Sequence, residues 1–494
     1  AYETVTTPIG KLGLLMGNDD MTFKASRELA LGGAQLLCHS MNSFALDQSR
    51  LHGPTRACEN KVFLAAANKV GSLIPEELIP AEHIAEKHIS SEHTFQEKTA
   101  TFSAQSAIPK EYLVGAGQSQ IVSPDGKVLA KIDNNKEGYV FADIELPSVV
   151  DLAECDVSNG NNKLRPDGTN IIEQRRPELY QALTLLSKQA TMREVTDQDV
   201  TNLEGTNLEE INKVPVTANV VIFATYKSNE EAIDDVCFYI ENNLSDIIQL
   251  PELFFIADKK ITHNTQQRSE IARFSEQLIS QISAELRPFQ YVCTSLVIEG
   301  KHQSVLISEQ GLFATQQQLH FCKRYQWTAL GDNLNIIELP LEQGNVTLAM
   351  LTADDANIPE LVNVAALNGI HLLLVPFDIQ EPCEAEYSLL SRAAENRICI
   401  VAATREKSFA NHFPTSNVPT NNVSIKNSNQ SSTNKKKVKT QKSTGLIANL
   451  TTNSALLSQW KSRKFDGFIN QPLVKHQQGK ITKAVIHPIA ACSK

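Results

Sequence analysis

One five-residue motif occurs twice in this chain, and its repetition is the strongest constraint on the fold. The motif Arg-Ala-x-Glu-Asn occupies residues 56–60, with Cys58 at its third position, and again residues 392–396, an offset of 336 positions. An apolar segment follows it both times, and the same offset relates Gly33 to Gly369. A gapless offset of this length is far longer than the repeat of a solenoid, so it indicates two copies of one domain.

Each copy shows the same alternation of predicted local structure. A helical segment is followed by a glycine, where helices commonly end, and then by a short apolar strand. The helix that carries the motif leads into another apolar strand. Strands and helices that alternate with short connections are typical of an α/β domain. The predicted helices are 27–31 and 362–367, and the predicted strands are 35–38, 62–67, 371–375 and 398–403.

Further motifs around these elements carry a family resemblance. Asp355 follows a strand and is followed by Ile-Pro-Glu at residues 358–360. Residues 117–121 read Gly-Gln-Ser-Gln-Ile, and residues 175–180 read Arg-Arg-Pro-Glu-Leu-Tyr. With these motifs the chain resembles the carbon–nitrogen hydrolase superfamily, which contains nitrilases and amidases. The resemblance covers most of the chain and implies an α/β fold, a nitrilase-like α-β-β-α sandwich, here duplicated.

The resemblance also implies domain boundaries. Residues 1–186 correspond to the C-terminal half of a first nitrilase-like domain, because residues 1–13 read as the strand pair that precedes the family's nucleophile. The polar residues 187–214 read as a linker. Residues 215–494 then form a second nitrilase-like domain with a low-complexity insertion at about 406–443. We therefore expect a fragment of a longer polypeptide.

Composition argues against several other classes of protein. The chain has 46 basic and 56 acidic residues and a net charge of −10, whereas nucleic-acid binding needs clustered cations. No apolar run is long enough for a membrane span. The nine cysteines form no Cys-x-x-Cys motif, and Cys38, Cys237, Cys293 and Cys399 lie in apolar segments. This pattern predicts buried, reduced thiols in a cytoplasmic protein.

Two charged segments have alternative interpretations. Residues 82–93 contain histidines and carboxylates, which are metal ligands. Because neither pair of neighbouring histidines has i, i+4 spacing, a solvated amphipathic helix is the favoured interpretation. Residues 434–439 are basic and resemble a localisation or anion-binding patch. The surrounding Asn, Ser, Thr and Lys instead favour a disordered loop. We expect no metal and no cofactor.

The resemblance implies three catalytic groups. In the family a cysteine thiolate attacks the carbonyl or nitrile carbon, a glutamate transfers protons, and a lysine stabilises the developing charge. Glu252 fits the glutamate, since it follows a strand and a proline. The family pattern Lys-x-His-Leu aligns with Gln318, so glutamine stands where lysine belongs. Lys323 is the nearby lysine that could replace it.

The nucleophile position holds no reactive group in either copy. Two residues before the matched aspartates lie Gly17 in the first copy and Ala353 in the second. Asp354 is an alternative, because a carboxylate can also act as a nucleophile. The favoured interpretation, however, is that Asp355 orders the loop and Asp354 is its neighbour. Loss of the nucleophile lowers turnover by roughly 10⁴ to 10⁶ in acyl-transfer enzymes.

These observations predict a carbon–nitrogen hydrolase-like protein with impaired catalysis. One alternative is an active hydrolase of a small amide or nitrile that uses Glu252 with a nucleophile other than cysteine. Another is a structural or regulatory assembly module. If the protein is such a catalytically impaired hydrolase, we expect its remaining pocket to bind a small amide, nitrile or carboxylate. The two copies are expected to pair within the chain through the helices outside their sheets, and a homo-oligomer is a further option.

Overall fold

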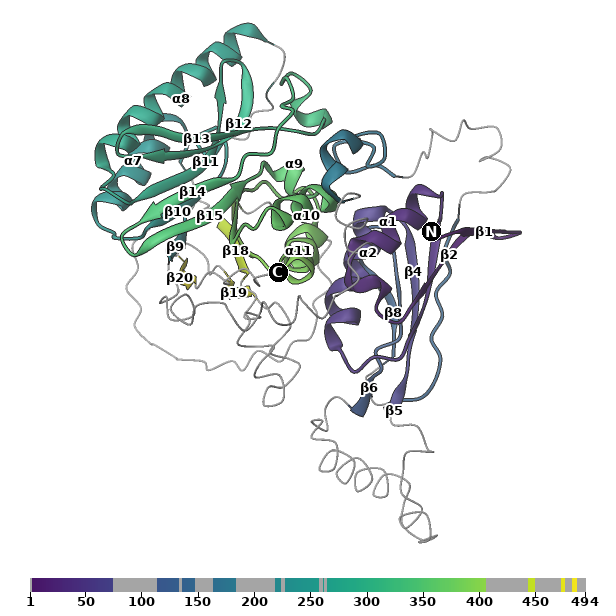
Figure 1. Cartoon of the computed structure of the whole chain (residues 1–494). Helices are drawn as coiled ribbons and strands as arrows, with labels where there is room; N and C mark the ends of the chain where they lie inside the picture. Colours follow the sequence, from purple (N-terminus) through teal and green to yellow (C-terminus); the bar gives the residue numbers. More distant parts are fainter. Residues whose placement is uncertain are drawn as a thin grey trace, which may run out of the picture.

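The computed structural model describes eleven segments of the chain, drawn in colour in Figure 1. Two α/β units lie side by side, and we call them the N-terminal and the C-terminal unit (Figure 1). The predicted linker 187–214 and the charged segments 82–93 and 434–439 lie outside the described residues. The structure describes residues 2–73, 113–132, 136–146, 163–183, 218–223, 227–256, 261, 264–405, 443–448, 472–475 and 482–486.

The C-terminal unit contains two six-stranded sheets, which we call sheet I and sheet II. Sheet I consists, in spatial order, of β13 (Gly311–Gln317), β12 (Lys301–Ser308), β11 (Tyr291–Ile298), β10 (Ile247–Glu252), β9 (Ala218–Ile222) and β20 (Thr482–Ile486). Sheet II consists of β14 (Ile337–Leu341), β15 (Gly344–Met350), β16 (Leu372–Pro376), β17 (Cys399–Arg405), β18 (Ser443–Ala448) and β19 (Pro472–Lys475).

The two sheets pack face to face. Strand β10 of sheet I contacts β16 and β17 of sheet II, and one apolar cluster fills the space between the sheets. Its members include Leu306 from β12, Met350 from β15 and Leu374 from β16, all fully buried. Burying a side chain of this size stabilises the fold by roughly 1.5–3 kcal/mol relative to exposure.

Helices cover the outer face of each sheet. The helices α7 (Asn229–Glu241) and α8 (Thr265–Glu285) pack on sheet I through one apolar face each. The helices α10 (Pro359–Leu367) and α11 (Leu389–Asn396) pack on sheet II. The layer order is therefore helix, sheet, sheet, helix, and the α-β-β-α sandwich that the family resemblance implied is correct for this unit.

The N-terminal unit contains one six-stranded sheet, which we call sheet III, with α1 (Phe23–Leu31) and α2 (Gly53–Asn60) on one face. A short ladder of β5 (Val70–Ser72) and β6 (Val114–Ala116) flanks the sheet. Sheet III consists of β1 (Thr4–Thr7), β2 (Gly10–Met16), β3 (Leu36–Met41), β4 (Phe63–Asn68), β7 (Gln120–Val122) and β8 (Val128–Lys131).

Sheets II and III have the same strand order and the same strand directions. In both, the pairs run antiparallel, parallel, parallel, antiparallel, antiparallel. A π-helical turn, η2 (Gln48–His52) or η9 (Glu384–Ser388), precedes the helix with the repeated motif. The residue that follows that helix, Lys61 or Arg397, has a left-handed backbone conformation, with φ of 50° and 57°. Positions separated by 336 residues therefore adopt the same local structure.

The two units differ in what covers the inner face of the sheet. Leu14 on β2 is 58% exposed. Its counterpart at the same offset, Met350 on β15, is fully buried against sheet I. Met16, also on β2, is 76% exposed. Among the described residues, this face of sheet III has no second sheet like sheet I packed on it.

A ring of four charged residues from the repeated motif joins the two units. Arg56 on α2 binds Glu59 of its own helix at 2.8 Å and Glu395 on α11 at 3.0 Å. Arg392 on α11 in turn binds Glu395 of its own helix and Glu59 on α2. All four side chains are at most 3% exposed. Each guanidinium thus bridges both units, which lowers the cost of burying these charges.

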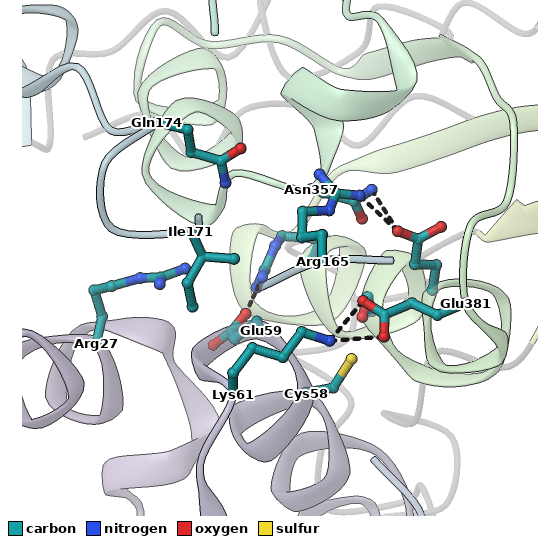
Figure 2. A pocket seen from close by; sticks show the side chains of 12 residues that line it. Arg27, Cys58, Glu59, Lys61, Arg165, Ile171, Gln174, Asn357 and Glu381 are labelled. Carbon is teal, nitrogen blue, oxygen red and sulfur yellow. Dashed lines mark hydrogen bonds and ion pairs between the residues drawn. The ribbon is translucent and has the colours of Figure 1, made fainter. Parts of the chain in front are cut away.

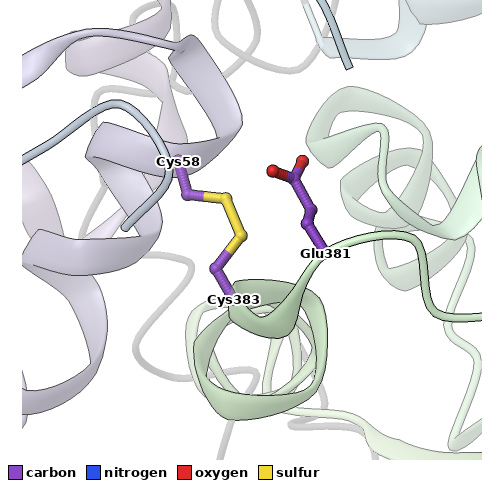
Figure 3. A group of neighbouring side chains, drawn as sticks. All are labelled: Cys58, Glu381 and Cys383. Atoms are coloured by element: carbon purple, nitrogen blue, oxygen red, sulfur yellow. A yellow bond between two sulfur atoms is a disulfide. The ribbon is translucent and has the colours of Figure 1, made fainter. Parts of the chain in front are cut away.

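A disulfide also joins the units and corrects one prediction. The sulfur atoms of Cys58 on α2 and Cys383 before η9 are bonded to each other (Figure 3). The prediction of reduced thiols is wrong for this pair, because packing of α2 against η9 brings together cysteines 325 positions apart. Cys293 and Cys399 are free and buried, as predicted, whereas Cys38 and Cys237 are free but only partly buried. Of the helices in the described segments, none combines the length and the apolar character that crossing a membrane requires.

Candidate functional site

Glu252 ends strand β10 in the interior of the C-terminal unit. All residues of this strand are buried, and its pairing with β11 is irregular just before Glu252, where Pro251 lacks a backbone N–H. The backbone N–H of Glu252 donates to the carbonyl oxygen of Phe377 at 3.3 Å, which ties β10 to the segment after β16. The residue predicted as the catalytic glutamate therefore lies at the end of β10, beside the segment that follows β16.

Arg324 binds this carboxylate directly. It belongs to the short 3-10 turn η8 (Lys323–Tyr325), and its Nη2 donates to Glu252 Oε2 at 2.9 Å. Its Nε donates to Asp354 at 2.8 Å, and its Nη1 donates to Asp378 at 2.5 Å. The neighbouring carboxylates, chiefly Asp354 and Glu252, raise the pKa of Arg324 although burial opposes this. One guanidinium therefore holds three carboxylates together.

The two positions that the sequence predicts for the nucleophile, Ala353 and Gly17, carry no reactive side chain. Ala353 is 1% exposed and begins the short helix α9 (Ala353–Ala356) directly after β15. Gly17 follows β2 with a left-handed φ of 57°. Its carbonyl oxygen accepts hydrogen bonds from His39 at 3.0 Å and from Gln48 at 2.9 Å. The two predicted nucleophile positions thus hold a methyl group and a hydrogen atom.

Asp354 is an ionised carboxylate with several partners. Besides Arg324, it accepts a hydrogen bond from Gln380 at 3.0 Å and pairs with Arg165 at 3.3 Å. Burial alone would raise its pKa, but Arg324 and Arg165 outweigh burial and lower the pKa to about 2. The oxygen atoms of Asp354 are therefore engaged with cations and amides, which reduces their nucleophilicity.

The structure does not bring Lys323 into this site. Lys323 is exposed, its side chain lies against Gly168, and its backbone N–H donates to the hydroxyl of Thr169 at 2.8 Å. The residues fold as a 3-10 turn rather than as a strand, so side chains no longer alternate between two faces. This turn directs Arg324, not Lys323, towards Glu252.

Gln318 occupies the position that aligns with the family's lysine, and it is fully buried. Its Oε1 lies 2.8 Å from Nδ1 of His302. Its Nε2 donates to the carbonyl oxygen of His320 at 2.7 Å and to the sulfur of Cys322 at 3.3 Å. A neutral amide with fixed partners therefore replaces the cation of the family pattern.

Comparisons with known proteins show a similarity over part of the chain. Residues 1–154 match the sequence model of the family described as carbon-nitrogen hydrolase. This part of the chain is thus similar to carbon–nitrogen hydrolases. It is 27% identical over 184 residues to a probable nitrilase of Schizosaccharomyces pombe, an alignment that covers 37% of this chain and 50% of that protein. The chain thus spans half the length of this relative.

Solved structures include similar carbon–nitrogen hydrolases. A mutant amidase of the nitrilase superfamily from Nesterenkonia is 17% identical with a TM-score of 0.38, covering 56% of this chain and 91% of the amidase. A carbon–nitrogen hydrolase from Helicobacter pylori is 15% identical with a TM-score of 0.38, covering 55% of this chain and 89% of that protein.

This carbon–nitrogen hydrolase relative has a thiol close to the site that the sequence analysis missed. Cys322 is 1% exposed and hydrogen-bonds to the Asp354 carboxylate and to the Gln318 amide. Burial, with Asp354 as the second cause, raises the pKa of this thiol well above its usual range. The thiolate is the nucleophilic form of cysteine, so Cys322 is held in its unreactive form at neutral pH.

His302 completes the surroundings of Glu252 as a neutral imidazole. Burial is the main reason why its pKa falls to about 4, and Arg324 lowers it further. Because Gln318 Oε1 can only accept, Nδ1 of His302 carries the proton and donates to it. Nε2 then accepts from the hydroxyl of Ser295 at 3.0 Å and lies 3.3 Å from Glu252 Oε1. The positive charge beside Glu252 thus comes from Arg324.

Asp355 orders the loop after sheet I, the role that the sequence analysis favoured for it. It accepts hydrogen bonds from the backbone N–H groups of Leu319 at 2.8 Å and His320 at 2.9 Å, and from the hydroxyl of Thr352 at 2.9 Å.

The turn η6 (Pro177–Tyr180) lies within the Arg-Arg-Pro-Glu-Leu-Tyr signature. Its Tyr180 hydroxyl contacts Nε2 of His320, so this N-terminal segment is anchored on the C-terminal unit.

One group of side chains has the composition of a metal site. The sulfurs of Cys58 and Cys383 and a carboxylate oxygen of Glu381 lie within 4.8 Å of one another. The sulfurs are bonded to each other, however (Figure 3), and Nζ of Lys61 binds Glu381 at 2.6 Å (Figure 2). Metal binding requires free thiolates, so this group does not form a ligand set in its disulfide form.

Proposed function

We propose that this member of the carbon–nitrogen hydrolase superfamily is a pseudoenzyme whose former catalytic centre stabilises the fold. The observation that carries the proposal is the arrangement around Arg324. Its guanidinium binds Glu252 and two aspartates, while alanine stands at position 353. A general base must be free to exchange protons with the substrate, and Glu252 is instead an acceptor in a fixed ion pair.

Electrostatics support a structural role for the network. Glu252, Asp354 and Asp378 would repel one another without a cation between them. Arg324 provides hydrogen bonds to all three, and Arg165 adds charge compensation at Asp354. Breaking a buried pair leaves an uncompensated charge, which costs about 3–5 kcal/mol. We infer that the network holds the turn η8, the strand end of β10 and the helix α9 together.

The remaining function is then one of assembly or regulation. The strand order shared by sheets II and III supports a tandem duplication, in which the two units pair through α2 and α11 as a single body. Both cross-unit links, the charged ring and the disulfide, lie at this helix contact. We propose that this paired body is the functional unit, acting on a partner rather than on an amide or nitrile.

Ammonia release from a panel of small amides and nitriles tests the proposal. We expect no release above the buffer rate from the wild-type protein. Glu252→Gln serves as the site variant, and Glu338→Gln, a change at an exposed position on β14, serves as the matched control. Turnover that Glu252→Gln abolishes and Glu338→Gln preserves would overturn the proposal.

One further variant separates the effect of the missing sulfur from that of the ion network. Ala353→Cys restores a thiol at the family position, and we expect it to remain inactive because Arg324 still binds Glu252. Ammonia release by Ala353→Cys alone would contradict the role given to Arg324. If the wild-type protein is active, Asp354→Asn and Cys322→Ala identify the nucleophile, since only one of them should abolish that activity.

A further inference from the structure

A polar pocket lies where the two units meet (Figure 2), and Glu252 is not among the residues that line it. It has about 390 Å³ of empty volume, including its open mouth. The N-terminal unit contributes Arg27 and Lys61, the segment before η6 contributes Arg165 and Gln174, and the C-terminal unit contributes Arg392. Any molecule held here would therefore contact both units at once.

The pocket wall carries an excess of positive charge. Its four basic side chains face three carboxylates, those of Glu59, Glu381 and Glu384. Each carboxylate already has a cation at hydrogen-bond distance. Lys61 binds Glu381 at 2.6 Å, Arg165 binds Glu384 at 2.6 Å, and Arg56 behind the wall binds Glu59 at 2.8 Å. The negative charges are thus compensated within the protein.

Several N–H groups at the pocket lack a hydrogen-bond acceptor. Arg27 is 5% exposed, and neither its Nε nor its Nη1 has a hydrogen bond, the nearest carboxylate being Glu360 at 3.4 Å. Figure 2 shows its guanidinium directed into the pocket beside Ile171. Oε1 of Gln174 is also buried without a hydrogen bond, as is Nη1 of Arg165, whose nearest carboxylate is Asp354 at 3.3 Å. Each such group costs about 1–3 kcal/mol if it stays unsatisfied.

The pKa values of neighbouring groups show the same positive potential. Burial, with Arg27 as the second cause, lowers the pKa of Lys163 to about 7. Burial is also the main reason why the pKa of Arg392 falls to about 10, and Arg56 and Arg27 lower it further while Glu395 opposes them. An anion near Arg27 would relieve this repulsion between cations.

We propose that this pocket binds a small oxyanion, either inorganic phosphate or a short carboxylate, which bridges the two units. Arg27 donates from Nε and Nη1, Arg165 donates from Nη1, and the Gln174 amide turns either its N–H₂ or its oxygen to the ligand. Guanidinium groups suit planar and tetrahedral oxyanions because their donors match the spacing of two oxygens. This site touches the Glu252 network through Arg165, which also pairs with Asp354, but it does not rest on the proposed loss of catalysis.

Thermal unfolding of the whole chain, titrated with phosphate, acetate or chloride at constant ionic strength, tests the proposal. A ligand that binds only the folded state raises Tm in a saturable, concentration-dependent way. We expect a saturable rise in Tm with phosphate or with acetate, and none with chloride. The anion that reaches half of its maximal Tm shift at the lower concentration identifies which of the two oxyanions the pocket binds. Calorimetric titration with the same salts measures Kd directly. An equal shift with all three salts, or none, would overturn the proposal.

Variants locate the binding site. Gln174→Glu keeps the side-chain shape but adds a negative charge to the pocket, so we expect Kd to rise at least tenfold. Arg27→Gln removes the unsatisfied guanidinium and should weaken binding similarly. Gln310→Glu, the same chemical change in the exposed turn between β12 and β13, is the matched control and should bind like the wild type. If Arg27→Gln does not fold, Gln174→Glu decides. Wild-type affinity in Gln174→Glu would refute the site.

Discussion

Replacing Arg324 with methionine removes the guanidinium from the centre of three carboxylates while preserving most of the side chain's apolar length. Glu252 and Asp354 are at most 1% exposed in their side chains, so neither can regain water. Leaving a buried charge uncompensated costs about 3–5 kcal/mol. We expect the free energy of unfolding to fall by about that amount at pH 7, since carboxylates are ordinarily ionised at this pH.

The pH dependence follows from the same pairing. In the wild type, the pKa of Asp354 falls to about 2 in the folded state. A lowered folded-state pKa contributes stability that is present above the unfolded pKa of roughly 4 and is lost as the pH falls towards 2. In Arg324→Met the carboxylates lose the cation that favours their charged form. The destabilisation should therefore be larger at pH 7 than at pH 4.

Urea unfolding followed by tryptophan fluorescence measures this effect. Trp327 is a suitable probe, since its ring lies 5.9 Å from that of Tyr325 in the same turn. Lys323→Met is the matched control, because Lys323 is the exposed neighbour and should change stability by less than about 0.5 kcal/mol. Equal effects of Arg324→Met and Lys323→Met would refute the assignment of a structural role to the ion network.

Three further predictions concern the other features of the fold. Leu14→Ala should change unfolding free energy by less than about 0.5 kcal/mol and Met350→Ala by about 2–5 kcal/mol, since only the second side chain is buried; similar losses in urea titrations would show that sheet III is covered on both faces. Burial raises the pKa of Asp20 to about 7, so its folded state retains a proton and stability falls as the pH rises from about 4 to 7. Asp20→Asn should therefore stabilise the protein more at pH 8 than at pH 5 in thermal unfolding, and an equal gain at both pH values would contradict this. Reduction of the Cys58–Cys383 bond should lower stability by about 2–4 kcal/mol, whereas a reductant that also destabilises Cys58→Ser would indicate another target.

Sequence patterns predicted the features that depend on local periodicity. The repeated motif and its apolar flanks placed helices near 27–31 and 362–367, and the structure has α1 and α10 there. Glu252 was recognised because its strand and proline are contiguous in sequence. Asp355 was recognised for the same reason, as part of a short turn motif. In each case the information lies within a few neighbouring residues.

The remaining site residues depend on contacts that sequence spacing does not encode. The choice between Lys323 and Arg324 is made by a single 3-10 turn, which changes the side-chain directions that a strand would give. The bond between Cys58 and Cys383 arises from packing of segments 325 positions apart. Cys322 gave no signal either, since its contact with Asp354 depends on how β15 ends beside that turn.

The charged ring between α2 and α11 also bears on how this sequence can change over time. Arg56 and Arg392 each bind a glutamate of both units, so a substitution in one motif alters the environment of the other. We therefore expect a charge change in one motif to be accompanied by a compensating change at its ion-pair partner in the other, which is 339 positions away for Arg56 and Glu395 and 333 for Glu59 and Arg392. Elsewhere the two units can accumulate differences independently, as the contrast between Leu14 and Met350 illustrates.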